Sequence, residues 1–157
     1  MLTPALLAAW QGTRVEILGP HGLQVIESIS DAVGRARVDA FGTRGHVVTA
    51  WNPGARVLTT QENAARHADL REVVASAGLV GLPATGRACD GTWHEQGVFL
   101  PARGTLADAR ETALALGRAF GQLGIYEIDA GELRALACAD GSVVAPCPTT
   151  AGAFPAG

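Results

Sequence analysis

The sequence contains no lysine, and all twelve of its basic residues are arginine. The absence excludes chemistry that needs a lysine side chain, namely the phosphate-binding P-loop, Schiff-base catalysis and a lysine general base. The arginines are scattered along a chain of net charge −3. Since no basic stripe follows the chain, we do not expect it to bind nucleic acid.

Residues that hold metals or form disulfides are also few. The three cysteines, Cys89, Cys138 and Cys147, are odd in number and show no CxxC spacing, so the sequence indicates neither a disulfide framework nor a thiolate zinc site. His94 and Glu95 begin an HExxH motif, but Val98 stands where its second histidine is required. We therefore expect no metal and no cofactor, and a reducing cytoplasm is the simplest location.

Long apolar runs are missing as well. None approaches the ~18 residues of a membrane span, so we expect no membrane partner. The opening MLTPALLAAW has no arginine before its apolar part and no small-residue cleavage site after it, which argues against a secretory signal. At 157 residues and 48% apolar content, we expect one globular domain over residues 1–147 and a flexible tail over residues 148–157.

The apolar patterns that are present predict helices alternating with hairpins. Thr3 and Pro4 are typical of a helix start, and two principal helices are expected at Gln61–Ala77 and Thr105–Phe120. Thr59 and Glu62 form a capping-box pattern before the first of them. A weaker helical stripe spans residues 31–41.

Strand patterns surround these helices. Hairpins are expected around residues 20–22, around Asp90-Gly91 and at Asp140-Gly141, with further strands at residues 45–52 and 124–129. Gly81, Pro83 and Gly86 predict that the strand before Asp90 is irregular or at an edge. We expect an α+β fold, a single layer of mixed, mainly antiparallel sheet with the two principal helices packed on it.

Three strings in the chain together resemble a known bacterial family. They are TAWNPGARVLTTQENAARHADL, GLPATGRACDGTWHEQGVFL and ALGRAFGQLGIY. In that order they are similar to the domain of unknown function 3293 family, whose pattern is roughly T-A-x-N-P, E-N-x-x-x-x-x-L, W-x-E and F-G-Q. The likeness covers about residues 14–128 and falls on Thr49, Ala50, Asn52, Pro53, Glu62, Asn63, Leu70, Trp93, Glu95, Phe120, Gly121 and Gln122. Leu123 stands where a small polar residue is expected, and the resemblance implies no particular activity.

Polar residues at a strand end and a helix start are the first candidates for a site. Asn52 ends the strand before Pro53, where a loop places a side chain on a rigid support, although Asn there also often bonds its own backbone. Asn63 lies in the first helical turn, and helix spacing puts Asn63 and Arg66 on one face. They are predicted to bind a ligand, and the alternative is a capped, solvated helix edge.

Glu95 is the second candidate, because it is a carboxylate between aromatic residues on an apolar strand face. Alternation places Trp93, Glu95 and Phe99 on one side. Burial would raise the pKa of Glu95 and a nearby arginine would lower it, and perturbed carboxylates are typical of sites. We expect Arg66 to be its bidentate partner, with Glu95 catalytic and Trp93 binding a ligand. A buried structural ion pair is the alternative.

Gln122 follows Phe120 and Gly121 at the end of the second principal helix. Gly121 is expected to cap that helix in the left-handed conformation. The Gln122 amide is then placed either to satisfy backbone groups or to join Asn52 in a ligand-binding cluster.

These residues leave two functions open, and the sequence does not decide whether the protein is an enzyme. In the first, the cluster binds a small polar or anionic ligand, nucleotides included, with Glu95 as acid or base and Arg66 as anion clamp. Glu95→Gln and Asn52→Ala should then keep the fold and lose the ligand. In the second, the cluster is a structural network in a noncatalytic module that binds a protein partner or another copy of itself through a strand edge.

Overall fold

The computed structural model describes residues 2–20, 22–27, 44–88, 91–129 and 132–146. The helix expected at residues 31–41, the tail from residue 148, and Cys89 and Cys147 lie outside these ranges. No helix within them is long and apolar enough to cross a membrane.

The described strands form one eight-stranded sheet in which every pairing is antiparallel. Its order is β2-β1-β4-β5-β3-β6-β7-β8. The strands are β1 (Thr13–Gly19), β2 (Gly22–Glu27), β3 (Gly45–Thr49), β4 (Leu82–Ala88), β5 (His94–Pro101), β6 (Gly124–Asp129), β7 (Glu132–Ala137) and β8 (Val143–Pro146). With α-helices α1 (Pro4–Gln11), α3 (Thr60–Ser76) and α4 (Leu106–Ala119), and the 3₁₀ turn η1 (Pro53–Ala55), the expected α+β fold is confirmed.

Both principal helices start at side-chain caps, and the first of these caps is the one that the sequence predicts. Thr59 and Glu62 form a reciprocal capping box, in which the Thr59 hydroxyl accepts from the Glu62 backbone and the Glu62 carboxylate accepts from that of Thr59. Thr105 caps α4 by accepting from the backbone N–H of Asp108. Local chemistry therefore fixes where α3 and α4 begin.

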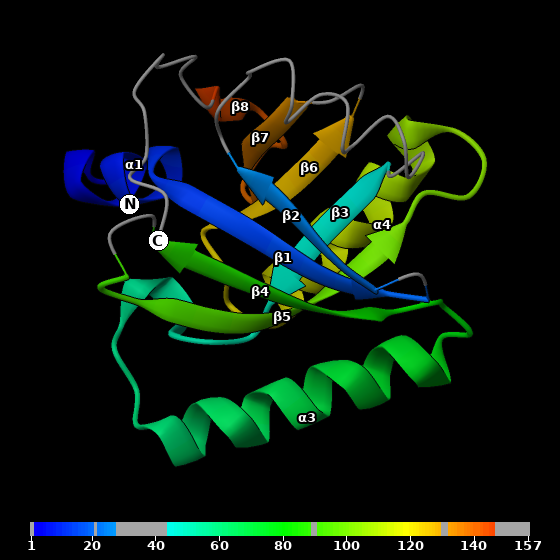
Figure 1. Cartoon of the computed structure of the whole chain (residues 1–157), viewed down its shortest axis with the longest axis horizontal. Coiled ribbons are helices and arrows are strands. Elements are labelled where there is room, and N and C mark those ends of the chain that lie inside the picture. The colour runs from blue at the N-terminus through cyan, green and yellow to red at the C-terminus, as the bar shows by residue number, and fades with distance from the viewer. Residues whose placement is uncertain (1, 21, 28–43, 89–90, 130–131, 147–157) are drawn as a thin grey trace.

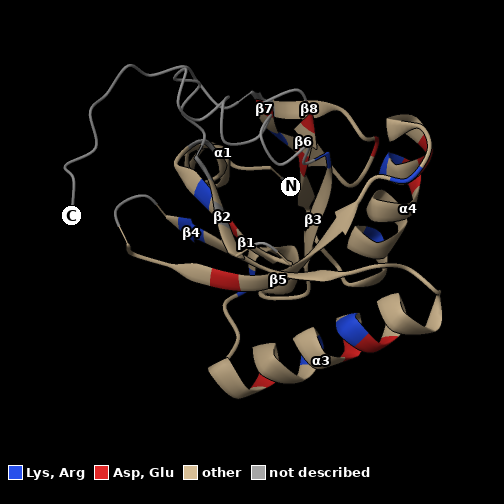
Figure 2. Cartoon of the chain, turned by 45° about the vertical axis from the view of Figure 1, so that its right-hand side comes forward, with Lys and Arg blue, Asp and Glu red and all other residues tan. Residues whose placement is uncertain are grey.

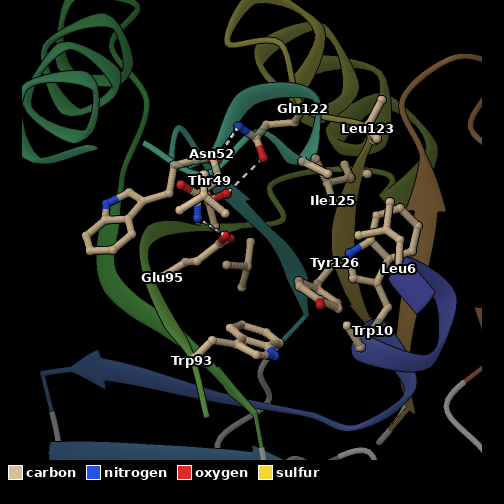
Figure 3. A pocket seen from close by; sticks show the side chains of 16 residues that line it. Leu6, Trp10, Thr49, Asn52, Trp93, Glu95, Gln122, Leu123, Ile125 and Tyr126 are labelled. Atoms are coloured by element: carbon tan, nitrogen blue, oxygen red, sulfur yellow. Dashed lines mark hydrogen bonds between the residues drawn. The ribbon is translucent and has the colours of Figure 1, made fainter. Parts of the chain in front are cut away.

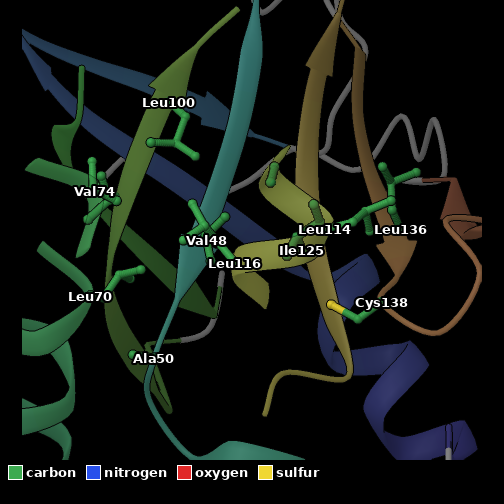
Figure 4. Packing of buried hydrophobic residues seen from close by; sticks show 12 residues of the cluster. Val48, Ala50, Leu70, Val74, Leu100, Leu114, Leu116, Ile125, Leu136 and Cys138 are labelled. Atoms are coloured by element: carbon green, nitrogen blue, oxygen red, sulfur yellow. The ribbon is translucent and has the colours of Figure 1, made fainter. Parts of the chain in front are cut away.

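One face of the sheet is covered by α3 and α4 (Figure 1). Leu70 and Val74 are the buried apolar residues of α3, whereas α4 buries a full stripe that includes Leu114 and Leu116. These side chains pack on Val48 and its neighbours in the central strands (Figure 4). The apolar alternation of β3 thus sends Val48 and Ala50 to the helices and Val47 to the opposite face.

The opposite face is concave, because the sheet curls until its ends approach each other. Val15 of β1 and Leu133 of β7 belong to the same buried cluster, although four strands lie between them in the sheet. The hydroxyls of Thr13 and Tyr126 meet across the hollow at 3.0 Å. Figure 1 shows β1 passing in front of β3 and β6. The curl gives this face an interior of its own.

Helix α1 lies against one end of the concave face. Its Trp10 ring packs so closely on Gly124 that a Cβ built at that glycine would lie 2.5 Å from the ring. The glycine at the start of β6 is therefore what lets the helix approach the sheet. Trp10 also packs against the concave apolar cluster.

Strand β4 was predicted to be irregular or at an edge, and the edge alternative is wrong for all of the strand after Pro83. The strand is interior, paired with β1 on one side and β5 on the other. Pro83 is tolerated because the β1 pairing reaches only Ala84, so that at Pro83 the strand has one neighbour. Gly86 lies against the Trp93 ring, since a Cβ built at this glycine would be 3.7 Å from the nearest ring atom.

A buried carboxylate, Glu127 of β6, fixes α4 to the sheet. Arg110 of α4 grips it with two hydrogen bonds of 2.7 and 2.8 Å, and Arg134 adds one of 2.9 Å. Fully buried His46 donates from Nε2 to the same carboxylate at 2.8 Å. Burial alone would raise the pKa of Glu127, but the hydrogen bonds from Arg110 and His46 outweigh it and hold that pKa below its usual value.

Glu127→Gln should lower the free energy of unfolding by about 3 kcal/mol, the low end of the cost of breaking a buried ion pair. The reason is that Arg110 and Arg134 lose their shared counter-charge while their backbones stay fixed. Urea denaturation at pH 7.5 measures the change.

Glu132→Gln is the matched control, because this exposed carboxylate also bonds Arg134, at 3.2 Å. Its loss should cost less than about 1 kcal/mol, as exposed pairs do. Equal losses in the two variants would contradict a central role for Glu127.

Candidate functional site

The concave face is not filled by side chains, and it holds a cavity of about 370 Å³. The cavity opens between α1, the η1 turn and the strands β3, β5 and β6 (Figure 3). Its lining residues are Leu6, Ala9, Trp10, Val47, Thr49, Trp51, Asn52, Ala55, Val57, Trp93, Glu95, Gln122, Leu123, Gly124, Ile125 and Tyr126. This volume lies within the ~300–1,000 Å³ of small-molecule sites.

The cavity has an apolar body and one polar end. Thr49, Asn52, Glu95 and Gln122 gather at that end, whereas Trp93 and the side chains of α1 and β6 form the other walls (Figure 3). Hereafter the four residues are called the polar end. A few polar groups converging in an otherwise apolar hollow are the usual composition of a ligand site.

Glu95 is the one carboxylate in the described lining of the cavity. The alternation of β5 puts it on the concave face with Gly97 and Phe99, as the sequence predicts. One oxygen, Oε1, accepts from Asn52 Nδ2 at 3.0 Å, and the Thr49 hydroxyl is a second hydrogen-bond partner of the carboxylate. Burial raises the pKa of Glu95, although Asn52 and Thr49 act in the opposite direction.

Asn52 is held in place by a lock of two amides. Its backbone is left-handed, with φ 48° and ψ 56°, a conformation that asparagine tolerates better than most residues. Asn63 accepts from the Asn52 backbone N–H at 2.9 Å and donates to Asn52 Oδ1 at 3.0 Å. Leu58 N–H also donates to Oδ1, at 3.0 Å. The lock aims Asn52 Nδ2 at Glu95.

Asn63 and Arg66 do not line the cavity. Asn63 is 2% exposed and spends its amide on Asn52 and the Leu58 carbonyl. Arg66 donates from Nε to the Ala50 carbonyl at 2.7 Å and from Nη2 to the Phe120 carbonyl at the end of α4. Both residues therefore join the β3 end and the two helices rather than facing a ligand.

The expected pair between Arg66 and Glu95 does not form. Arg66 comes from α3 on the helix-covered face, whereas Glu95 points into the concave face, so the sheet separates them. Strand alternation gave the correct face for Glu95, but the position of α3 was not available from local pattern. The carboxylate is instead bonded by the Asn52 amide.

Gln122 satisfies backbone groups, which is one of the two roles considered for it, and it also lines the cavity beside Asn52. Gly121 caps α4 with φ 72°, and the next residue turns its amide to the polar end. Gln122 Nε2 donates to the Trp51 carbonyl at 2.9 Å, and Oε1 accepts from Thr49 at 3.1 Å. The amide thus satisfies a backbone group and completes one wall of the cavity.

Local sequence patterns did not indicate the apolar walls that α1 and β6 form. Leu6, Ala9 and Trp10 are spaced as one face of a helix, which is a signal for a buried contact but not for a cavity. Tyr126 carried a second signal, since a buried tyrosine needs a partner, and here it meets Thr13. Leu123, where a polar residue was expected, extends the apolar wall.

Comparison with known families gives one match. The family described as "Protein of unknown function (DUF3293)" matches residues 48–125, about half of the chain. The chain belongs to the DUF3293 family. The DUF3293 match contains all four residues of the polar end together with Asn63 and Arg66, whereas α1, which forms part of the cavity wall, precedes it. Comparisons with curated proteins and with solved structures give no significant match.

Side chains that bind metals do not converge in this DUF3293 protein, as far as the described residues go. No group of three or more His, Cys, Asp or Glu side chains comes together among them. Cys138 is free and buried, and burial raises the pKa of its thiol to about 11. A thiol in that state is not an activated nucleophile.

Asn52→Ala should destabilise the protein by about 2–3 kcal/mol, rather than leave it intact as the sequence suggested. Alanine loses three side-chain hydrogen bonds and is strained in the left-handed conformation. Asn52→Gly relieves the backbone strain and should recover about 1 kcal/mol of that loss. Chemical denaturation of both variants checks it, and an alanine variant as stable as the wild type would contradict the lock.

Glu95→Gln should raise the stability at pH 7.5 by about 0.5–2 kcal/mol, as single stabilising substitutions do. The folded pKa of Glu95 is raised, so the folded state binds its proton more tightly than the unfolded state does. The ionised carboxylate therefore costs stability above its unfolded pKa, and that cost disappears as the pH falls. Thermal unfolding of both proteins at pH 7.5 and pH 4 should show the gain only at the higher pH.

Proposed function

We propose that this protein binds a small organic molecule in the concave cavity, with the apolar part of the ligand between α1 and β6 and a polar group at the polar end. The observation that carries the proposal is the cavity itself, about 370 Å³ of space next to an incompletely bonded carboxylate. A packed interior normally leaves few voids larger than a water molecule. An unfilled hollow of this size is therefore better explained by a ligand than by packing.

The expected preference for an anionic or nucleotide-like ligand finds no support at this site. No arginine belongs to the described lining, and Arg66, the predicted anion clamp, is bonded to backbone carbonyls. An anion at the polar end would lie beside Glu95 and be repelled by it. The proposal is therefore a small, largely apolar ligand.

Glu95 keeps its place as the candidate catalytic residue, because it is the carboxylate that a bound molecule would touch. Its raised pKa is typical of acids and bases in sites, although structural carboxylates show it too. We therefore propose binding only. A reaction at Glu95 and a cytoplasmic location stay predictions from the sequence.

The alternative, a noncatalytic interaction module, is favoured by a different part of the molecule. Strand β2 ends the described sheet, and the β1–β2 hairpin exposes 53% of Leu18 and 59% of Leu23. Exposed apolar residues at a sheet edge suit pairing with another chain. This surface lies apart from the lining of the cavity, so the two functions are compatible.

Filling the cavity tests the proposed function. Ala9→Phe places a ring in the hollow from α1 and should weaken the binding of a neutral apolar probe, 5-fluoroindole, at least tenfold in a fluorine NMR titration. Ala8→Phe is the matched control, the same substitution one residue earlier on the exposed side of the helix. It should bind the probe as the wild type does.

Circular dichroism and thermal unfolding show whether each variant is folded. If Ala9→Phe does not fold, Val47→Phe fills the same hollow from β3 and replaces it. Failure of the wild-type protein to bind the probe, or equal binding by a folded cavity-filling variant, would overturn the proposed function.

A further inference from the structure

The amides of the polar end, those of Asn52 and Gln122, already make most of their hydrogen bonds to other protein groups. Asn52 Oδ1 already accepts two hydrogen bonds, from Leu58 and Asn63, and Nδ2 donates one hydrogen to Glu95. Gln122 accepts from Thr49 and donates to the Trp51 carbonyl and, at 3.5 Å, to that of Phe120. Neither amide is left with its full capacity for a ligand.

The capacity that remains is mainly that of an acceptor. A carboxylate has about four lone-pair sites, and that of Glu95 has two hydrogen-bond partners in the described chain, Asn52 and Thr49. The Thr49 hydroxyl has one hydrogen for two acceptors, Gln122 Oε1 and the Glu95 carboxylate, so its own oxygen is left to accept. A ligand at this end must therefore bring hydrogens.

The charges around the cavity also favour a ligand that brings hydrogens, and in particular a cationic one. Glu95 is the carboxylate of the lining that the structure describes, and this lining includes no cation. The arginines on the other face are occupied, Arg110 and Arg134 with Glu127 and Arg66 with backbone carbonyls. A positive charge placed at the polar end would meet an uncompensated carboxylate in a partly desolvated site, where opposite charges attract more strongly than in water.

The residues of the cavity walls indicate which chemistry the rest of the ligand should have. Trp10, Trp93 and Tyr126 present aromatic rings around the hollow, and Trp93 and Glu95 project into the same space (Figure 3). Aromatic walls suit a flat apolar body, and the face of a tryptophan attracts a cation. Glu95 and Trp93 together therefore provide a counter-charge and a π face for one cationic group.

On the basis of the proposed function, we propose that the ligand is a small alkylamine that carries an aromatic ring, bound as an ammonium cation whose N–H groups donate to Glu95 while its ring lies between Trp93, Trp10 and Tyr126. The cation would stabilise the ionised carboxylate that burial disfavours. No bond is made or broken in this step. The ligand class is set by one carboxylate, an acceptor-rich end and aromatic walls.

Three probes that share one ring and differ in charge test the ligand class. They are 5-fluorotryptamine, which is cationic, 5-fluorotryptophol, which is neutral, and 5-fluoroindole-3-acetate, which is anionic. Fluorine NMR titrations at pH 7.5 should give the amine a Kd at least tenfold below that of the alcohol, since hydrogen bonds to a charged group exceed neutral ones by about this factor. The acetate should bind more weakly than both.

Two variants assign the preference to the proposed group. Glu95→Gln keeps the shape and the Asn52 contact but removes the charge, so its preference for the amine over the alcohol should fall to about one. Glu72→Gln makes the same change of net charge on the exposed side of α3 and should keep the wild-type preference. Comparing the two separates the site from the overall charge of the protein.

The outcomes distinguish this inference from the proposed function. If the alcohol binds the wild type as tightly as the amine, or Glu95→Gln keeps the preference, the inference is overturned while the cavity remains a binding site. The same holds if the three probes fail to bind but 5-fluoroindole binds in a manner that Ala9→Phe abolishes. If 5-fluoroindole itself does not bind, the proposed function and this inference fail together.

Discussion

The reciprocal amide pair of Asn52 and Asn63 is the interaction on which the site depends. It joins the end of a central strand to the first turn of α3, and it closes over a backbone conformation that most residues avoid. Since the same Asn52 side chain donates to Glu95, hydrogen bonds connect the start of α3 to the wall of the cavity. Arg66 strengthens it by joining the carbonyls of Ala50 and Phe120.

The two faces of the sheet treat charge in opposite ways. On the helix-covered face, Glu127 is fully buried and surrounded by Arg110, Arg134 and His46, so its charge is compensated within the protein. On the concave face, the partners of Glu95 are the Asn52 amide and the Thr49 hydroxyl, and the described lining holds no cation. Figure 2 shows the acidic residue of β5 on the strand above α3. A compensated carboxylate holds a fold together, whereas an uncompensated one is available to a ligand.

The two faces of the sheet also differ in shape, because the sheet curls. A flat sheet would leave the concave residues exposed, and here β1 and β6 approach until Thr13 meets Tyr126. The interior that results is only partly filled, because α1 covers one end of it and Gly124 lets Trp10 come close. The cavity is therefore a product of curvature and helix placement, and no single segment of the chain encodes it.

Local sequence patterns predicted most of the secondary structure and the identity of several wall residues. The capping box gave the start of α3, apolar spacing gave α4, alternation gave the faces of β3 and β5, and turn residues gave three of the hairpins. The edge alternative for β4 failed, because an edge position depends on which strands become neighbours. Asn52, Trp93, Glu95 and Gln122 were selected as chemically unusual, and they meet at one cavity.

What the sequence by itself determined were the elements and the residues that do not suit a plain core, since both follow from interactions within a few positions of the chain. Only the tertiary structure decided the partners. It gave Arg66 to backbone carbonyls, gave Glu95 the Asn52 amide, and brought Trp10 and Tyr126 to a common hollow. The physical reason is that these contacts join segments far apart in sequence, and their geometry depends on how the sheet curls.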